Sequence, residues 1–166
     1  MRTELRRAGE QGPSGQCYHL EAGHCHVSIG WSDWLPTPYA RSHDGKLTLI
    51  LLGECFERSR LTAAELLDRC QLRGLCALEG LNGRYAAIVI DEAGESFTVV
   101  TDPLGLRKLY QHDLPGSRLF CNSLEFFRRL PGFRARLDPY GAAQLLITSH
   151  LCDEHTLLDG GSLLPP

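Results

Sequence analysis

Cysteine and histidine are the side chains of this sequence whose chemistry is easiest to recognise. Seven cysteines occur without a Cys-x-x-Cys pair, and residues 1–16 have no apolar core typical of a secretory signal, so we expect reduced thiols in a cytoplasmic protein. His24, Cys25 and His26 are consecutive, and the two histidines would share one face of a strand. A zinc site needs three or four ligands, and no second cluster accompanies these residues, so the sequence predicts no metal site.

Length and composition are those of one ordinary soluble domain. The chain has 166 residues, of which 43% are hydrophobic and 22% are charged, and its net charge is -3. Neither nucleic acid nor a membrane surface is expected as a partner, and no apolar stretch approaches the roughly 20 residues of a membrane span. We predict a flexible tail over residues 1–16 and one domain over residues 17–166.

The sequence predicts several strands, including a hairpin, that would position the side chains of a functional site. The apolar run 83–91 and the β-rich run 96–101 flank a polar turn, which predicts a hairpin inside a sheet, with Ile88 and Ile90 inaccessible. Residues 46–52 predict another strand. Four further cysteines stand in apolar surroundings and are expected in the core, namely Cys55, Cys70, Cys76 and Cys121.

Two helices have clear start signals. Thr62 and Glu65 form a capping box, which predicts a helix that runs to about Cys70. Asp138 as N-cap and Pro139 at the first helical position predict a second helix. We expect its apolar face to consist of Ala142, Ala143, Leu145 and Leu146. Strands and helices in this order predict an α+β domain of layered sheets.

A series of short motifs, none specific by itself, occurs in a distinctive order. Leu-Asn-Gly precedes the hairpin, and Asp-x-x-Gly-x-x-x-Leu-Tyr follows it, which involves Leu81, Asn82, Gly83, Asp102, Gly105, Leu109 and Tyr110. The order resembles the N-terminal glutaminase domain of asparagine synthetases over about residues 46–166. The resemblance implies a four-layer αββα sandwich of the N-terminal-nucleophile hydrolase type. It also implies that Asp102 and Gly105 form a structural turn.

The resemblance also implies what is missing. In the family, a Cys follows the initiator Met, and its freed α-amine activates the thiol that attacks glutamine. This chain has Arg2 there. The family's Asn-Gly-Glu run supplies an oxyanion hole and a carboxylate for the substrate's amino group; here it reads Leu52, Gly53, Glu54. Gly53 and Glu54 therefore match as remnants of substrate binding, and Leu52 replaces an oxyanion donor. Arg41 is the nearest arginine for the glutamine carboxylate, but its surroundings do not match.

We therefore predict a glutamine amidotransferase-like domain with a degenerate glutaminase site, as in relatives such as β-lactam synthetases and lasso-peptide cyclases. Its expected partner is a C-terminal synthetase domain or a separate synthetase chain. ATP and Mg²⁺ are expected only in that domain, which we expect to be absent from this chain because no Ser-Gly-Gly-x-Asp-Ser loop is present.

Two alternatives remain open. Processing before Cys17 would expose a nucleophile and give an active glutaminase, with Cys25 as the other candidate thiol. Against this, Cys17 is followed by Tyr18 and His19 rather than by Gly and small apolar residues. The chain could also be a stand-alone binding module that docks on a separate synthetase.

Overall fold

The computed structural model describes residues 15–22, 25–32, 35–151 and 153–165. It divides into two compact units, residues 1–100 and residues 101–166, which are described separately over their described parts. Strand β1 begins at Gly15, two residues before the domain boundary that the sequence predicts, and the rest of the predicted tail lies outside the described residues.

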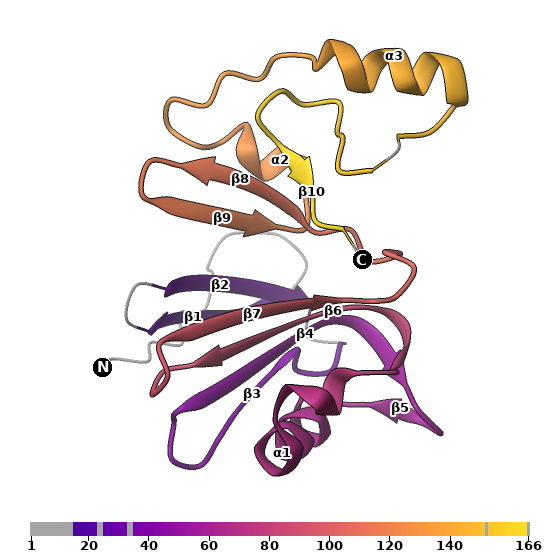
Figure 1. The fold of residues 1–166 in the computed structure, drawn as a ribbon. Helices are drawn as coiled ribbons and strands as arrows, with labels where there is room; N and C mark the ends of the chain where they lie inside the picture. The colour runs from indigo at the N-terminus through magenta and orange to yellow at the C-terminus, as the bar shows by residue number, and fades with distance from the viewer. Residues whose placement is uncertain (1–14, 23–24, 33–34, 152, 166) are drawn as a thin grey trace. The chain divides into compact units, whose positions relative to one another are not determined.

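A five-stranded sheet is the centre of unit 1 (Figure 1). Its order is β3-β4-β6-β7, and β5 pairs with β4 beside β3. Strands β4 and β6 are antiparallel over their full length, from Leu47 opposite Asp91 to Phe56 opposite Asn82. The strands are β3 (Tyr39–Arg41), β4 (Leu47–Phe56), β5 (Arg60–Leu61), β6 (Asn82–Asp91) and β7 (Ser96–Thr101).

The predicted hairpin is present as β6 and β7, but only β6 is an interior strand. Among the described strands β7 lies at the edge of the sheet, so the expectation of two interior strands is wrong for β7. The sequence contains the reason: β6 is apolar on both faces, whereas Ser96, Thr98 and Thr101 interrupt β7, and its residues are at most half-buried.

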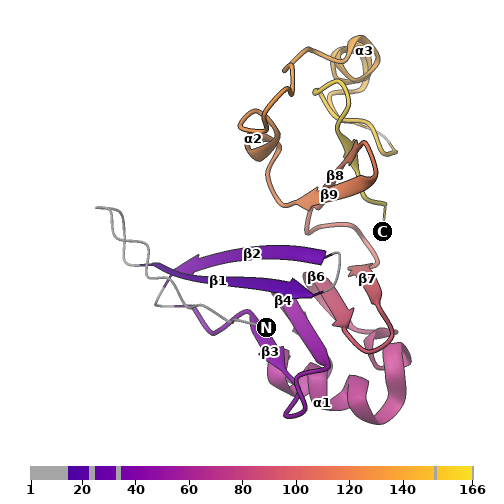
Figure 2. The same ribbon diagram turned by 90° about the vertical axis from the view of Figure 1, so that its left-hand side faces the viewer.

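The two faces of the sheet are covered by different layers (Figure 2). Helix α1 (Ala63–Arg73) and the 3-10 helix η1 (Gly74–Leu78) pack on one face through Leu66, Leu67 and Leu78. The hairpin of β1 (Gly15–Ala22) and β2 (Cys25–Ser32) packs on the other face through an isoleucine cluster, which consists of Ile29, Ile50, Ile88 and Ile90. Ile88 and Ile90 are 8% and 2% exposed, as expected. Mixed helices and antiparallel sheets confirm the α+β class.

Helix α1 begins as the sequence predicts and ends slightly later. Thr62 Oγ1 accepts from Glu65 N, and Glu65 Oε2 accepts from Thr62 N at 2.8 Å, which completes the capping box. The helix continues to Arg73, where Gly74 follows with a φ of +66°. Cys70 is buried as predicted, whereas the expectation for Cys76 is wrong, because this residue is exposed.

Unit 2 combines a small antiparallel sheet with two helices. Phe127 is fully buried at its centre, where its ring lies 5.5 Å from the His112 ring and 6.0 Å from the Phe133 ring. The sheet has the order β10-β8-β9. Its elements are β8 (Tyr110–Leu114), β9 (Ser117–Cys121), α2 (Leu124–Phe127), α3 (Pro139–Thr148) and β10 (Ser162–Leu163).

Helix α3 starts at the predicted cap but does not bury the predicted face. Asp138 accepts hydrogen bonds from the backbone N–H groups of Tyr140 and Gly141. Leu146 is 86% exposed, and Gly141 is the buried residue of the helix. A Cβ on Gly141 would lie 2.2 Å from the backbone oxygen of Thr156, so the helix packs by backbone approach instead of an apolar face. No helix in the described part of the chain is long and apolar enough to cross a membrane.

Candidate functional site

Gly53 and Glu54 lie inside strand β4. The sequence predicts a strand over residues 46–52, which places Gly53 and Glu54 just after its end, but β4 continues to Phe56 and pairs with β6 along this whole segment. Gly53 is opposite Tyr85, and Glu54 is opposite Arg84. The two predicted remnants are therefore held in a regular ladder, with an arginine as the cross-strand neighbour of the carboxylate.

Two glycines allow the strands to approach closely here. Gly53 has a φ of +100°, and a Cβ on it would lie 2.2 Å from the backbone oxygen of Arg84. Gly83 has a φ of +142°, and a Cβ on it would lie 2.3 Å from the backbone oxygen of Glu54. Both positions combine a backbone conformation that favours glycine with a contact that excludes any side chain. The glycines therefore fix the ladder step that carries Glu54 and Arg84.

Glu54 is held by an arginine from the neighbouring short strand. The Arg60 guanidinium lies 3.0 Å from Glu54 Oε1, and about half of each side chain is exposed. Arg84 is also exposed, and its side chain has no hydrogen-bond or ion-pair partner among the described residues. The charged end of the sheet consists of Glu54, Arg60, Arg84 and Phe56, which is 39% exposed.

Leu52 occupies the position where the resemblance expects an oxyanion donor. Its side chain is partly buried and packs against the isoleucine cluster on the face that β2 covers. A leucine side chain offers no hydrogen-bond donor. The side chain at this position can contribute apolar packing but cannot stabilise a developing negative charge.

Both candidate nucleophiles lie in the hairpin of β1 and β2. Cys17 lies in β1 with its backbone opposite Gly30, and Cys25 begins β2 opposite Ala22. The side chains of both cysteines lie outside the described residues, as do Arg2 and His24. The proposal that Cys17 is a nucleophile therefore stays a prediction.

Two other residues that the sequence singled out have structural roles. The Arg41 guanidinium lies 2.7 Å from Glu92 Oε1 and donates to the backbone oxygen of Gly45, so it joins two turns of unit 1. Asp102 is fully buried, and its carboxylate accepts from the backbone N–H groups of Leu104, Leu106 and Arg107 at 2.8–3.1 Å. Asp102 therefore organises the turn in which Gly105 has a φ of +59°, as expected.

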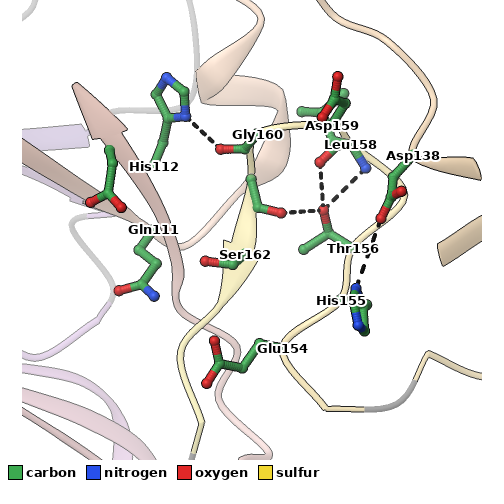
Figure 3. Close-up of a pocket in the computed structure, with 12 residues that line it drawn as sticks. Gln111, His112, Asp138, Glu154, His155, Thr156, Leu158, Asp159, Gly160 and Ser162 are labelled. Atoms are coloured by element: carbon green, nitrogen blue, oxygen red, sulfur yellow. Dashed lines mark hydrogen bonds and ion pairs between the residues drawn. The ribbon is translucent and has the colours of Figure 1, made fainter. Parts of the chain in front are cut away.

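A pocket of about 530 Å³ lies within unit 2 (Figure 3). At its wall the Thr156 hydroxyl donates to the backbone oxygens of Leu158 and Gly161 and accepts from Leu158 N. The lining also includes His112 and His155, and four acidic residues without a lysine or arginine, namely Asp113, Asp138, Glu154 and Asp159. No local sequence pattern predicts this pocket, because its walls come from β8, β10 and loops that are distant from one another in the sequence.

Both histidines and two of the four carboxylates of this pocket make local contacts. His112 Nδ1 lies 2.5 Å from the backbone oxygen of Gly160, and His155 Nδ1 lies 3.9 Å from Asp138 Oδ2, whose carboxylate caps α3. Asp113 is paired with Arg118. Over the described residues, no three His, Cys, Asp or Glu side chains are placed to hold one metal ion.

Comparison with known proteins does not assign the chain to a family. No protein-family model matches it, and no curated protein matches it.

Proposed function

We propose that the chain is a glutamine amidotransferase-like domain of the asparagine-synthetase type whose glutaminase site is degenerate. In this proposal the domain has a structural or docking role beside an ATP-dependent synthetase that forms amide bonds. That synthetase is a C-terminal domain or a separate chain, and ATP and Mg²⁺ belong to it.

The observation that carries the proposal is the apolar packing of Leu52. The neighbouring Gly53 and Glu54 match the family's motif, and the backbone at Gly53 is tightly constrained. The remaining position of the motif is Leu52, which is partly buried and packs against the isoleucine cluster. Loss of one oxyanion donor typically lowers turnover by about 10² to 10³. A leucine in place of the oxyanion donor, beside a matching Gly53 and Glu54, supports a degenerate glutaminase site.

The layers of unit 1 support the fold of the proposal. Helix α1, the five-stranded sheet and the hairpin of β1 and β2 follow one another as α, β and β layers. The residues that carry the resemblance also have roles that explain them: Leu81 and Leu109 are buried, Gly83 allows the close strand approach, and Asp102 is the centre of a turn. A four-layer αββα sandwich of the N-terminal-nucleophile hydrolase type is the proposed complete arrangement.

The first prediction is that the purified chain does not hydrolyse glutamine. Without a nucleophile and with Leu52 in place of a donor, neither attack nor stabilisation of the intermediate is available, and loss of the nucleophile alone removes about 10⁶ in turnover. The measurement is release of ammonia and glutamate, with Cys17→Ala and Cys25→Ala run beside the native chain. Equal background in all three is expected. Turnover near about 1 s⁻¹ that one variant abolishes would identify an active glutaminase and its thiol.

A further inference from the structure

The charged end of the sheet lies on the same face as the isoleucine cluster. Side chains alternate between faces along β4, so Ile50, Leu52, Glu54 and Phe56 share one face. Ile50 and Leu52 belong to the apolar packing with β2, whereas Glu54 and Phe56 are exposed. The apolar covering therefore stops at Leu52, and the last step of the face is open to solvent.

Two guanidinium groups flank β4 at this open step. Strand β6 pairs with one edge of β4 and places Arg84 opposite Glu54. Strand β5 pairs with the other edge and places Arg60 opposite Phe56, from where it reaches Glu54. Residues directly opposite in an antiparallel ladder have Cβ atoms about 5 Å apart. Arg84 is therefore the cross-strand neighbour of Glu54, and Arg60 is the cross-strand neighbour of Phe56 and the ion-pair partner of Glu54.

The charge balance of this surface is positive, although the whole chain has a net charge of -3. Glu54 is paired with Arg60, and the nearby Glu57 is paired with Arg69 at 3.0 Å. The Arg84 side chain forms no ion pair or hydrogen bond with the described residues, although Glu54 lies opposite it on β4. An ammonium ligand would have to compete with Arg60 for Glu54, whereas an anion could pair with the guanidinium of Arg84.

We propose that the charged end of the sheet binds a small carboxylate. The carboxylate pairs with Arg84 and is also attracted by Arg60, and the apolar part of the ligand rests on Phe56. A guanidinium fork matches a carboxylate in shape as well as charge. The proposal rests on the proposed function only because Glu54 belongs to the remnant motif. A glutaminase would use this carboxylate to bind the amino group of glutamine, whereas the site proposed here binds an anion. Because the site is open, binding is weak, with a Kd of about 1 mM.

The second prediction tests this proposal on the full chain, labelled with ¹⁵N for NMR. Phenylacetate is the probe, phenethylammonium is the probe of opposite charge, and 2-phenylethanol is the neutral control. Phenylacetate is expected to shift the side-chain resonances of Arg84 and Arg60 and the backbone amides of Gly53 and Glu54. The other two compounds are expected to leave these resonances in place at the same concentrations.

Variants separate a specific site from a general effect of charge. Arg84→Gln should raise the Kd for phenylacetate about tenfold, which is the loss of one charge-assisted hydrogen bond, and Arg84→Lys should give an intermediate value because it keeps the charge without the fork. Arg60→Gln frees Glu54, so phenethylammonium should now shift the Glu54 resonance. Arg73→Gln, an exposed change of equal charge on α1, should bind phenylacetate like the native chain.

Three results would overturn the proposal. The first is that about 50 mM phenylacetate, well above the Kd expected here, shifts no resonance at the charged end of the native protein. The second is that the carboxylate and the ammonium probe give equal shifts. The third is that Arg73→Gln and Arg84→Gln weaken phenylacetate binding equally. None of them bears on the glutaminase prediction, which fails only if glutamine is turned over. The two proposals can therefore fail separately.

Discussion

Two separate constraints exclude a side chain at Gly53 and Gly83. At both positions a positive φ coincides with a neighbouring carbonyl oxygen within 2.3 Å of the ideal Cβ. Gly80 also has a positive φ, of +71°, but no atom lies within 4 Å of its ideal Cβ. A comparison of these positions separates backbone strain from steric exclusion.

The third prediction uses this difference. Gly80→Ala should cost only the left-handed backbone conformation, about 1 kcal/mol. Gly53→Ala should cost about 3 kcal/mol or more, because strain of about 1 to 3 kcal/mol is joined by a contact that moves β4 away from β6. Urea unfolding of the three proteins measures both costs. Similar values for the two variants would contradict a close approach of the strands at Gly53.

At the scale of elements, helix α1 depends on a capping box that contains a titratable group. Hydrogen bonds from the backbone N–H and the side-chain hydroxyl of Thr62 lower the pKa of the Glu65 carboxyl below its ordinary value of 4.5. A lowered pKa in the folded state means that the charged form stabilises the helix. This stabilisation is present above the pKa of the unfolded chain and is lost as the pH falls through the folded value.

The fourth prediction follows from this sign. Glu65→Gln keeps a hydrogen-bond acceptor at the third helical position but has no charge. The native protein should melt at a higher temperature than the variant near pH 7, and the difference should become smaller as the pH falls below 4.5 and through the lowered pKa of Glu65 in the folded protein. Thermal melting followed by circular dichroism across this range gives the answer. A difference that is constant with pH would exclude a role for the Glu65 charge.

Elements with local signals were predictable from the sequence, and elements defined by distant neighbours were not. Thr62 and Asp138 mark helix starts because a cap needs only its own first turn. The edge position of β7 depends on which strands lie beside it, and the exposure of Leu146 depends on what packs against α3. Similarly, Gly53 and Glu54 could be found in the sequence, but their neighbour Arg84 follows only from the register between β4 and β6.

At the scale of the molecule, each unit has its own buried centre. Ile88 belongs to the isoleucine cluster that joins the two sheets of unit 1, and Phe127 is the fully buried aromatic residue of unit 2. The cost of truncating such a residue is the lost transfer free energy together with the cavity that remains. Each truncation should therefore weaken the unit whose centre it empties.

The fifth prediction assigns these effects by amide hydrogen exchange. Ile88→Ala should cost about 2 to 5 kcal/mol and Phe127→Ala about 3 to 5 kcal/mol. Because residues exchange through the opening of the cooperative unit that contains them, Ile88→Ala should speed exchange in β4 and β6, and Phe127→Ala should speed exchange in β8 and β9. Leu146→Ala, at an 86% exposed position, is the control and should change neither. If each core variant instead accelerates exchange equally in all four strands, the two units unfold as one cooperative unit, which contradicts this prediction.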